Sequence, residues 1–174
     1  MKQFLIKYWF ILLIIAGVVY SCKKMEEYPV IPAIEYEDFI KLYNPSQGIF
    51  DRGVFKISFT DGDGDIGLTQ NDTLPPYEYN LFITYYEIQY GDTVEVVLTK
   101  YNHETGQYDT LTFNGRIPIL TPQGSNKSIK GEIEDTLFIY NYSSDFDTIM
   151  YDAYIVDRAL HKSNVVQTPL IIRK

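Results

Sequence analysis

Three aspartates alternate with glycines in the stretch FTDGDGDIGL, residues 59–68. Asp61, Asp63 and Asp65 place a carboxylate at every second position, and the glycines between them allow the chain to curl. Carboxylates turned toward one centre suit Ca²⁺, a hard cation that takes about six to eight oxygen ligands. The stretch therefore predicts a calcium site built from these three side chains and the backbone carbonyl of Ile66.

Two further aspartates outside this run are candidate ligands. Asp72 follows Asp61 at the spacing where a calcium-binding helix–loop–helix places its last acidic ligand. The loop is of another kind, however, because Ile66 stands where that motif needs glycine and a strand pattern precedes Asp61. Asp157, in VDRALHKSN, either faces the Asp61 loop or caps its own turn, and both alternatives stay open.

Catalysis and a plain turn are the two alternatives to a metal site. ISFTDGD resembles the motif of the haloacid dehalogenase superfamily, which implies a nucleophile at Asp61 and an acid/base at Asp63. That chemistry belongs to a parallel α/β sheet, and the sequence lacks the crossover helices. A turn explains one or two Asp-Gly pairs, but it leaves three close like charges without a counterion. We therefore expect bound calcium and no enzymatic activity.

The N-terminus has the pattern of a secretion signal. Lys2 and Lys7 precede an apolar run over residues 8–19, and Ser21 stands directly before Cys22, the single cysteine of the chain. This arrangement resembles a bacterial lipobox, which implies cleavage before Cys22 and its lipidation. We expect a signal peptide at 1–21, a tether at 22–32 and a membrane anchor through the lipid. KMEE, just beyond Cys22, loosely resembles the surface-export signal of Bacteroidota lipoproteins.

The charge balance restricts the partners. The chain carries 15 Lys and Arg residues against 23 acidic ones, and Lys2 and Lys7 leave with the signal peptide, so the mature chain has a net charge of −10. Such a chain repels nucleic acid and anionic lipid, whereas a divalent cation is a natural partner. With Cys22 lipidated, no cysteine remains for a disulfide in the folded part.

Strand-like segments fill the rest of the chain. In VFKISFT (54–60), Phe55, Ile57 and Phe59 share one face, which is the period-two pattern of a half-buried strand. Residues 35–44 are the single weak helix candidate. Similar strand patterns lie at 80–90, 93–101, 108–113, 128–140, 147–159 and 165–173. About seven antiparallel strands at this spacing predict an all-β protein with one β-sandwich over residues 33–174.

Two motifs carry a family resemblance. FTDGDGDIGL and, near the C-terminus, YDAYIVDRALHKSNVVQTPLII look like those of uncharacterised Bacteroidota lipoproteins with an immunoglobulin-like or cadherin-like domain. The resemblance implies a fold and a place in the cell envelope, as an outer-membrane lipoprotein that is periplasmic or surface-exposed. It implies no activity.

The expected function follows from these patterns. We expect a non-catalytic, calcium-stabilised module that binds an unknown protein or glycan, or that serves as an accessory subunit. A glycan-binding accessory lipoprotein is the alternative, with a groove lined by exposed tyrosines such as Tyr85, Tyr86, Tyr101 and Tyr108. An enzyme that uses the Asp61/Asp63 pair is the third and less favoured hypothesis.

Overall fold

The computed structural model describes residues 26–120 and 127–173, and this part of the chain contains strands and no helix. The strands are β1 (Ala33–Asn44), β2 (Ile49–Asp61), β3 (Leu81–Gln89), β4 (Asp92–Glu95), β5 (Leu98–Asn102), β6 (Gln107–Leu111), β7 (Ile129–Phe138), β8 (Thr148–Ile155), β9 (Val166–Gln167) and β10 (Ile171–Ile172). None of these residues belongs to a helix that is long and apolar enough to cross a membrane. The predicted signal peptide and Cys22 lie outside them.

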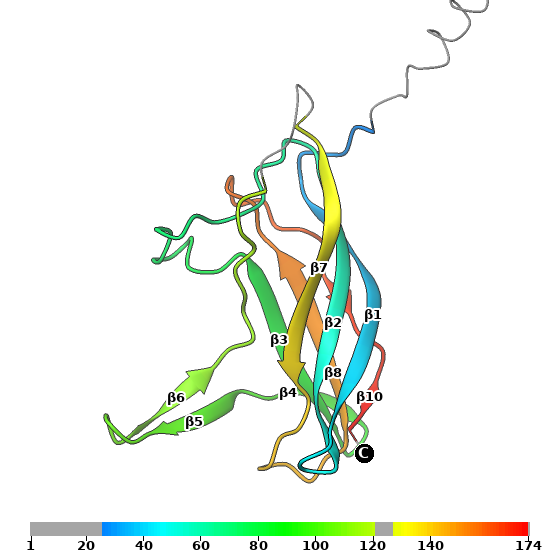
Figure 1. Ribbon diagram of the computed structural model, residues 1–174, viewed down its shortest axis with the longest axis vertical. Helices are drawn as coiled ribbons and strands as arrows, with labels where there is room; N and C mark the ends of the chain where they lie inside the picture. The colour runs from blue at the N-terminus through cyan, green and yellow to red at the C-terminus, as the bar shows by residue number, and fades with distance from the viewer. Residues whose placement is uncertain (1–25, 121–126, 174) are drawn as a thin grey trace, which may run out of the picture.

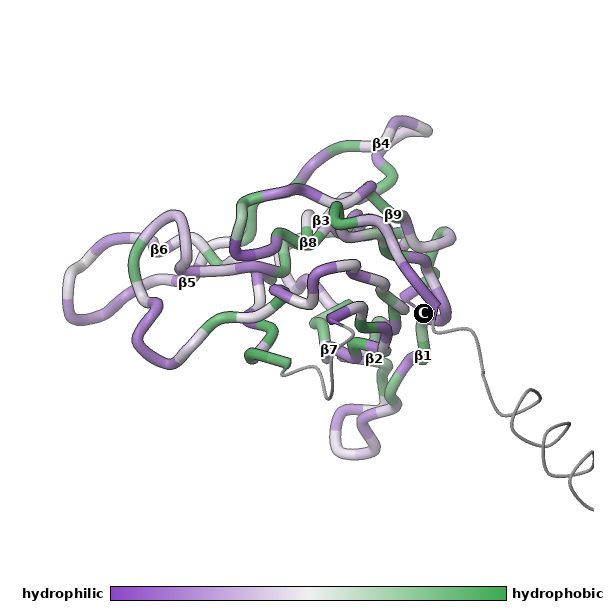
Figure 2. Tube along the Cα trace, turned by 90° about the horizontal axis from the view of Figure 1, so that it is seen from above, coloured by the Kyte–Doolittle hydropathy of each residue, from purple (hydrophilic) through white to green (hydrophobic). Residues whose placement is uncertain are grey.

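Two antiparallel sheets face each other and form a β-sandwich (Figures 1 and 2). One sheet has the order β1-β2-β7, and the other has the order β10-β8-β3-β4, with β9 paired to β8. The predicted all-β sandwich is therefore confirmed. Residues 35–44, the weak helix candidate, belong to β1 instead, because pairing with β2 along its whole length overrides a weak local preference.

The core lies between the two sheets and follows the alternation of the sequence. Phe55, Ile57 and Phe59 of β2 are at most 4% exposed, as the pattern predicts. From the other sheet, Tyr151 and Ile155 of β8 are fully buried against them. Each large apolar side chain buried in this way contributes about 1.5–3 kcal/mol to folding.

On the outer face of the first sheet, Lys56 pairs with Glu132 and Glu134.

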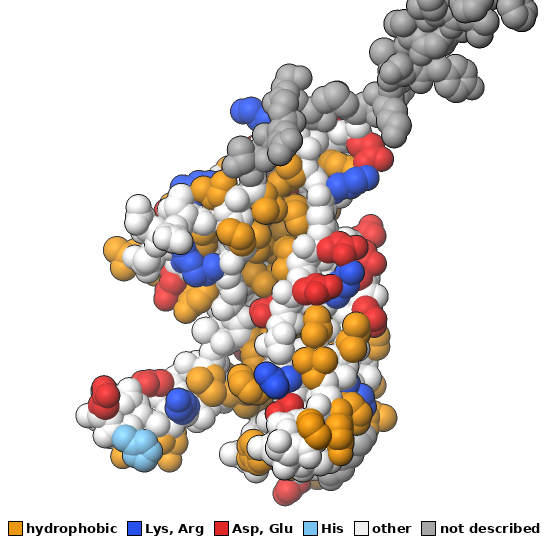
Figure 3. Space-filling view, in the orientation of Figure 1, with side chains coloured by type: hydrophobic (Ala, Val, Ile, Leu, Met, Phe, Trp, Pro, Cys, Tyr) orange, Lys and Arg blue, Asp and Glu red, His pale blue; other side chains and the backbone are white. Residues whose placement is uncertain are grey.

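The segment 93–101, predicted as one strand, is divided between β4 and β5. Val96 still donates its N–H to the Tyr85 carbonyl, but the chain then leaves the sheet and Val97 is 62% exposed. β5 and β6 pair with each other alone among the described strands, and they form an arm that projects from the sandwich (Figures 1 and 3). The alternation of TVEVVLTKY runs through this break, so local pattern does not reveal it.

Candidate metal centre

Asp61 is buried because it continues the inward face of β2. It follows Phe55, Ile57 and Phe59 at the same alternation, and β2 ends at this residue. The side chain therefore points toward the interior at the end of the strand, and it is 0% exposed. A carboxylate in such a place is costly unless it is paired or coordinates a metal.

The curl after β2 brings Asp63 and Asp65 back to Asp61. One carboxylate oxygen from each of the three residues lies within 4.8 Å of the others. Oxygens that share a Ca²⁺ ion at about 2.3–2.6 Å can be at most about 5 Å apart, so this spacing fits one calcium ion. Gly64, which lies between Asp63 and Asp65, has a φ of 67°, a left-handed conformation that glycine adopts without strain.

Three oxygens of this cluster have no hydrogen-bond partner in the described structure. They are the Oδ1 atoms of Asp61, Asp63 and Asp65, and all three are shielded from solvent. The other oxygens of Asp61 and Asp65 are held in place: Asp61 Oδ2 accepts the Asp65 N–H at 3.0 Å, and Asp65 Oδ2 accepts the Ala159 N–H at 3.2 Å. The loop thus fixes one oxygen of each of these two carboxylates by backbone donors and leaves the second free for a ligand.

The electrostatics of the cluster favour a cation. Burial raises the pKa of Asp61 to about 6, and the charges of Asp63 and Asp65 add to this shift. The pKa of Asp65 is also raised, by burial and then by the charges of Asp157 and Asp63. Among the described residues, no Lys or Arg makes an ion pair with any of the three clustered aspartates. A bound divalent cation would supply the missing positive charge.

Asp157 does both things that the sequence left open. It caps its own turn, because Oδ1 accepts the His161 N–H at 2.7 Å and Oδ2 lies 2.9 Å from His161 Nδ1. It also lies near enough to Asp65 to raise the pKa of that group. Both Asp157 oxygens are thus engaged by His161, and the residue is not a member of the three-aspartate cluster.

The structure does not bring Asp72 into the cluster. Its Oδ2 accepts the backbone N–H and the hydroxyl of Thr69 and lies 2.9 Å from Arg158 Nη1. The Arg158 bond, followed by those from Thr69, lowers the pKa of Asp72 to about 2. Arg158 also donates to the Gly67 carbonyl, so it ties the loop after β8 to the aspartate loop. No motif in the sequence points to this role of Arg158.

Ile66 fills a structural position in the loop. Its side chain is 1% exposed and belongs to the core, and its backbone amide partly offsets the rise in the pKa of Asp61. The predicted ligand is the Ile66 carbonyl oxygen, which stays a prediction. The buried side chain fixes the loop on the core and so holds the neighbouring Asp65 in place.

The segment that enters the domain packs on the same loop. A Cβ placed on Gly62 would lie 2.2 Å from the Tyr28 carbonyl oxygen, so glycine is needed for this close approach. Ser128, just before β7, donates to the Gly62 carbonyl at 3.0 Å. Pro32 is fully buried. The predicted tether therefore meets the aspartate loop at Tyr28 and is buried at Pro32, whereas most of its other described residues are exposed.

The tyrosines predicted to line a glycan groove do not share one surface. Tyr85 is 3% exposed and lies in the core. Tyr86 is half-buried on β3, whereas Tyr101 and Tyr108 are exposed together on the projecting arm, with their ring centroids 5.2 Å apart.

Comparison of the chain with models of protein families, with curated proteins and with solved structures gives no match.

Proposed function

We propose that this chain is a lipid-anchored protein of the cell envelope whose β-sandwich is locked by Ca²⁺ and serves as a binding or accessory module. The observation that carries the calcium proposal is the convergence of three buried, unpartnered oxygens from Asp61, Asp63 and Asp65. A disulfide-free extracellular domain gains rigidity when a cation ties a strand end to its loop.

Burial supports binding over catalysis for the Asp61/Asp63 pair. A raised pKa suits a general acid, but Asp61 is 0% exposed, so its carboxylate does not face the solvent from which a substrate would approach. A buried carboxylate with one unpartnered oxygen suits a structural cation better than a reacting group.

The proposed location in the cell envelope rests on the N-terminal sequence. The lipobox-like VYSC supports an outer-membrane lipoprotein, and the two quoted motifs support an immunoglobulin-like domain of the kind found in Bacteroidota lipoproteins. A glycan is the alternative ligand to a protein partner.

Calorimetric titration of the chain lacking residues 1–22 tests the calcium proposal. We expect CaCl₂ to bind with a stoichiometry of about one, whereas MgCl₂ binds weakly because Mg²⁺ demands shorter bonds and octahedral geometry. A flat CaCl₂ titration together with an unchanged melting temperature would refute the site.

A further inference from the structure

Tyr90 occupies a turn position that tyrosine rarely takes. It forms with Gly91 the two-residue connection between β3 and β4, in which Gln89 pairs with Asp92. Both connecting residues have positive φ, 55° at Tyr90 and 98° at Gly91. Asn, Asp or Gly is preferred at such a position, and a bulky residue is strained there. Strain of this kind is found preferentially at functional sites.

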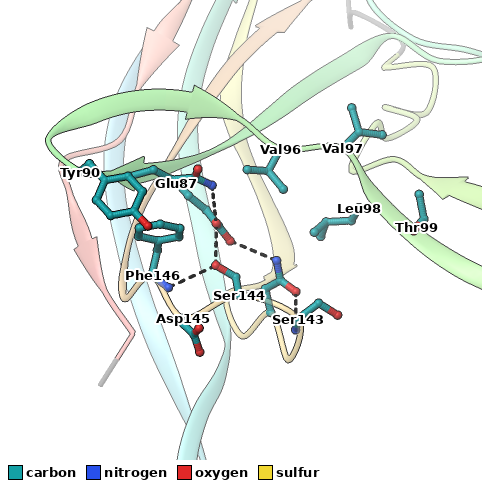
Figure 4. A pocket seen from close by; sticks show the side chains of 12 residues that line it. Glu87, Tyr90, Val96, Val97, Leu98, Thr99, Ser143, Ser144, Asp145 and Phe146 are labelled. Atoms are coloured by element: carbon teal, nitrogen blue, oxygen red, sulfur yellow. Dashed lines mark hydrogen bonds between the residues drawn. The ribbon is translucent and has the colours of Figure 1, made fainter.

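The Tyr90 side chain is displayed to solvent at the rim of a pocket. It is 95% exposed, and its ring meets Phe146 edge to face at 5.3 Å between centroids. The pocket has a volume of about 620 Å³, within the range of small-ligand sites. One wall runs from β3 through residues 96–99, and the other is the loop 141–146 (Figure 4).

A buried glutamate fixes the two walls relative to each other. Glu87 is 1% exposed, and its carboxylate accepts hydrogen bonds from four side chains. They are Tyr85 (2.9 Å), Gln89 (3.1 Å), Asn141 (3.1 Å) and Ser144 (2.7 Å). Two of these donors, Asn141 and Ser144, come from the loop 141–146, and Figure 4 shows Ser144 beside Glu87. Glu87 is therefore saturated and holds the loop in place before any ligand arrives, which reduces the entropic cost of binding.

The remaining groups of the pocket match a sugar. Tyr90 and Phe146 bring two aromatic rings to the lining, and Thr99, Ser143 and Asp145 are polar residues of the same lining. A pyranose ring has an apolar C–H face for an aromatic ring and hydroxyls for such polar groups. The described lining includes no Lys, Arg or His, and this, with the acidic Asp145, disfavours phosphate and anionic sugars.

The pocket faces away from the end where the chain enters the domain. Residues 26–32 meet the sandwich at one end, whereas the β3–β4 turn and the loop after β7 lie at the other (Figure 1). A domain anchored through its N-terminus would thus present this pocket outward.

We propose that this pocket binds a unit of a neutral oligosaccharide, with Tyr90 as the stacking platform. The proposal deepens the binding-module function proposed above and rests on it, but it does not require calcium. It replaces the scattered tyrosines of the sequence prediction with Tyr90, a tyrosine held at positive φ in the β3–β4 turn.

Calorimetry of the full chain in mild detergent tests this proposal. The probes are hexasaccharides of glucose, mannose, galactose and xylose, with an anionic galacturonate oligomer as comparison. We expect at least one neutral probe to bind, and Tyr90→Ala to weaken that binding about tenfold or more while Tyr90→Phe retains it. Tyr108→Ala, which removes a 71% exposed tyrosine on the arm, is the matched control and should bind as the wild type does.

Tyr90→Asn separates binding from folding. Asparagine adopts positive φ readily, so this variant should melt at a higher temperature than the wild type and still lose the saccharide. The proposal is overturned if no neutral probe binds, if only the galacturonate or a peptide binds, or if Tyr90→Ala leaves affinity unchanged. CaCl₂ titration of the same samples separates the two proposals: calcium binding without saccharide binding refutes this one alone, and the converse result refutes the metal site alone.

Discussion

Asp61→Asn should stabilise the metal-free protein and abolish its response to calcium. The substitution keeps the shape of the side chain and an oxygen that can accept the Asp65 N–H, but it removes one buried charge. The pKa of Asp61 is raised from 3.8 to about 6 in the folded protein. At about 1.36 kcal/mol per pKa unit, the ionised Asp61 costs the metal-free fold about 3 kcal/mol at neutral pH.

That cost sets the size of the expected effect. Since the Asn amide can also donate to the carboxylates of Asp63 and Asp65, the variant should recover about 1–3 kcal/mol, or roughly 3–10 °C in melting temperature. The wild type should instead gain about 2.7 kcal/mol when free Ca²⁺ is about 100-fold above its dissociation constant. The variant lacks that gain, so adding calcium should shift the difference in stability between the two proteins by about 2.7 kcal/mol in favour of the wild type.

Urea unfolding followed by circular dichroism measures both effects. The buffers are stripped of metal and then used with or without CaCl₂, and Asp92→Asn, at an exposed position on β4, is the control for loss of an ordinary surface charge. Asp92→Asn should respond to calcium as the wild type does. The reasoning fails if Asp61→Asn is less stable than the wild type without metal, or if calcium stabilises both proteins equally.

Two further outcomes are expected. In metal-free buffer the free energy of unfolding should fall as pH rises from about 4 to about 6, because the raised pKa values of Asp61 and Asp65 make the folded state hold more protons than the unfolded state in that window; saturating CaCl₂ should remove this fall, and a metal-free stability that rises over the same window would contradict the account. Gly62→Ala should cost about 1–3 kcal/mol, because its methyl group would meet the Tyr28 carbonyl oxygen at 2.2 Å and displace the entering segment; an unchanged urea midpoint would show that residues 26–32 do not need this contact.

Much of the sandwich and of the three-aspartate cluster could be predicted from local pattern. The alternation that buries Phe55, Ile57 and Phe59 extends unchanged to Asp61. The sequence pattern of β2 therefore predicts that the Asp61 side chain points inward. Asp63 and Asp65 follow from the same run of alternating aspartates and glycines. These features depend on residues that are neighbours in the sequence, so the local sequence pattern is sufficient to predict them.

The partners of the loop could not be predicted, because they come from the far end of the chain. Arg158 reaches Asp72, and the Ala159 N–H reaches Asp65, only because β8 ends beside β2 in space. Spacing along the chain therefore made Asp72 a candidate ligand, whereas in the fold Asp72 pairs with the guanidinium of Arg158. Tyr90 was missed for a related reason: Tyr-Gly carries none of the usual Asn-Gly or Asp-Gly turn signal.

The direction of β1 has a mechanical consequence. If the chain is held by its N-terminus, a pull on a ligand at the far end of the sandwich loads β1 along its own axis. Its ladder with β2 runs from Ala33 opposite Thr60 to Asn44 opposite Ile49, with hydrogen bonds across the line of force. These bonds are sheared together instead of being unzipped one by one, so rupture must break many at once. The long first strand then acts as the part that keeps a tethered molecule folded under tension.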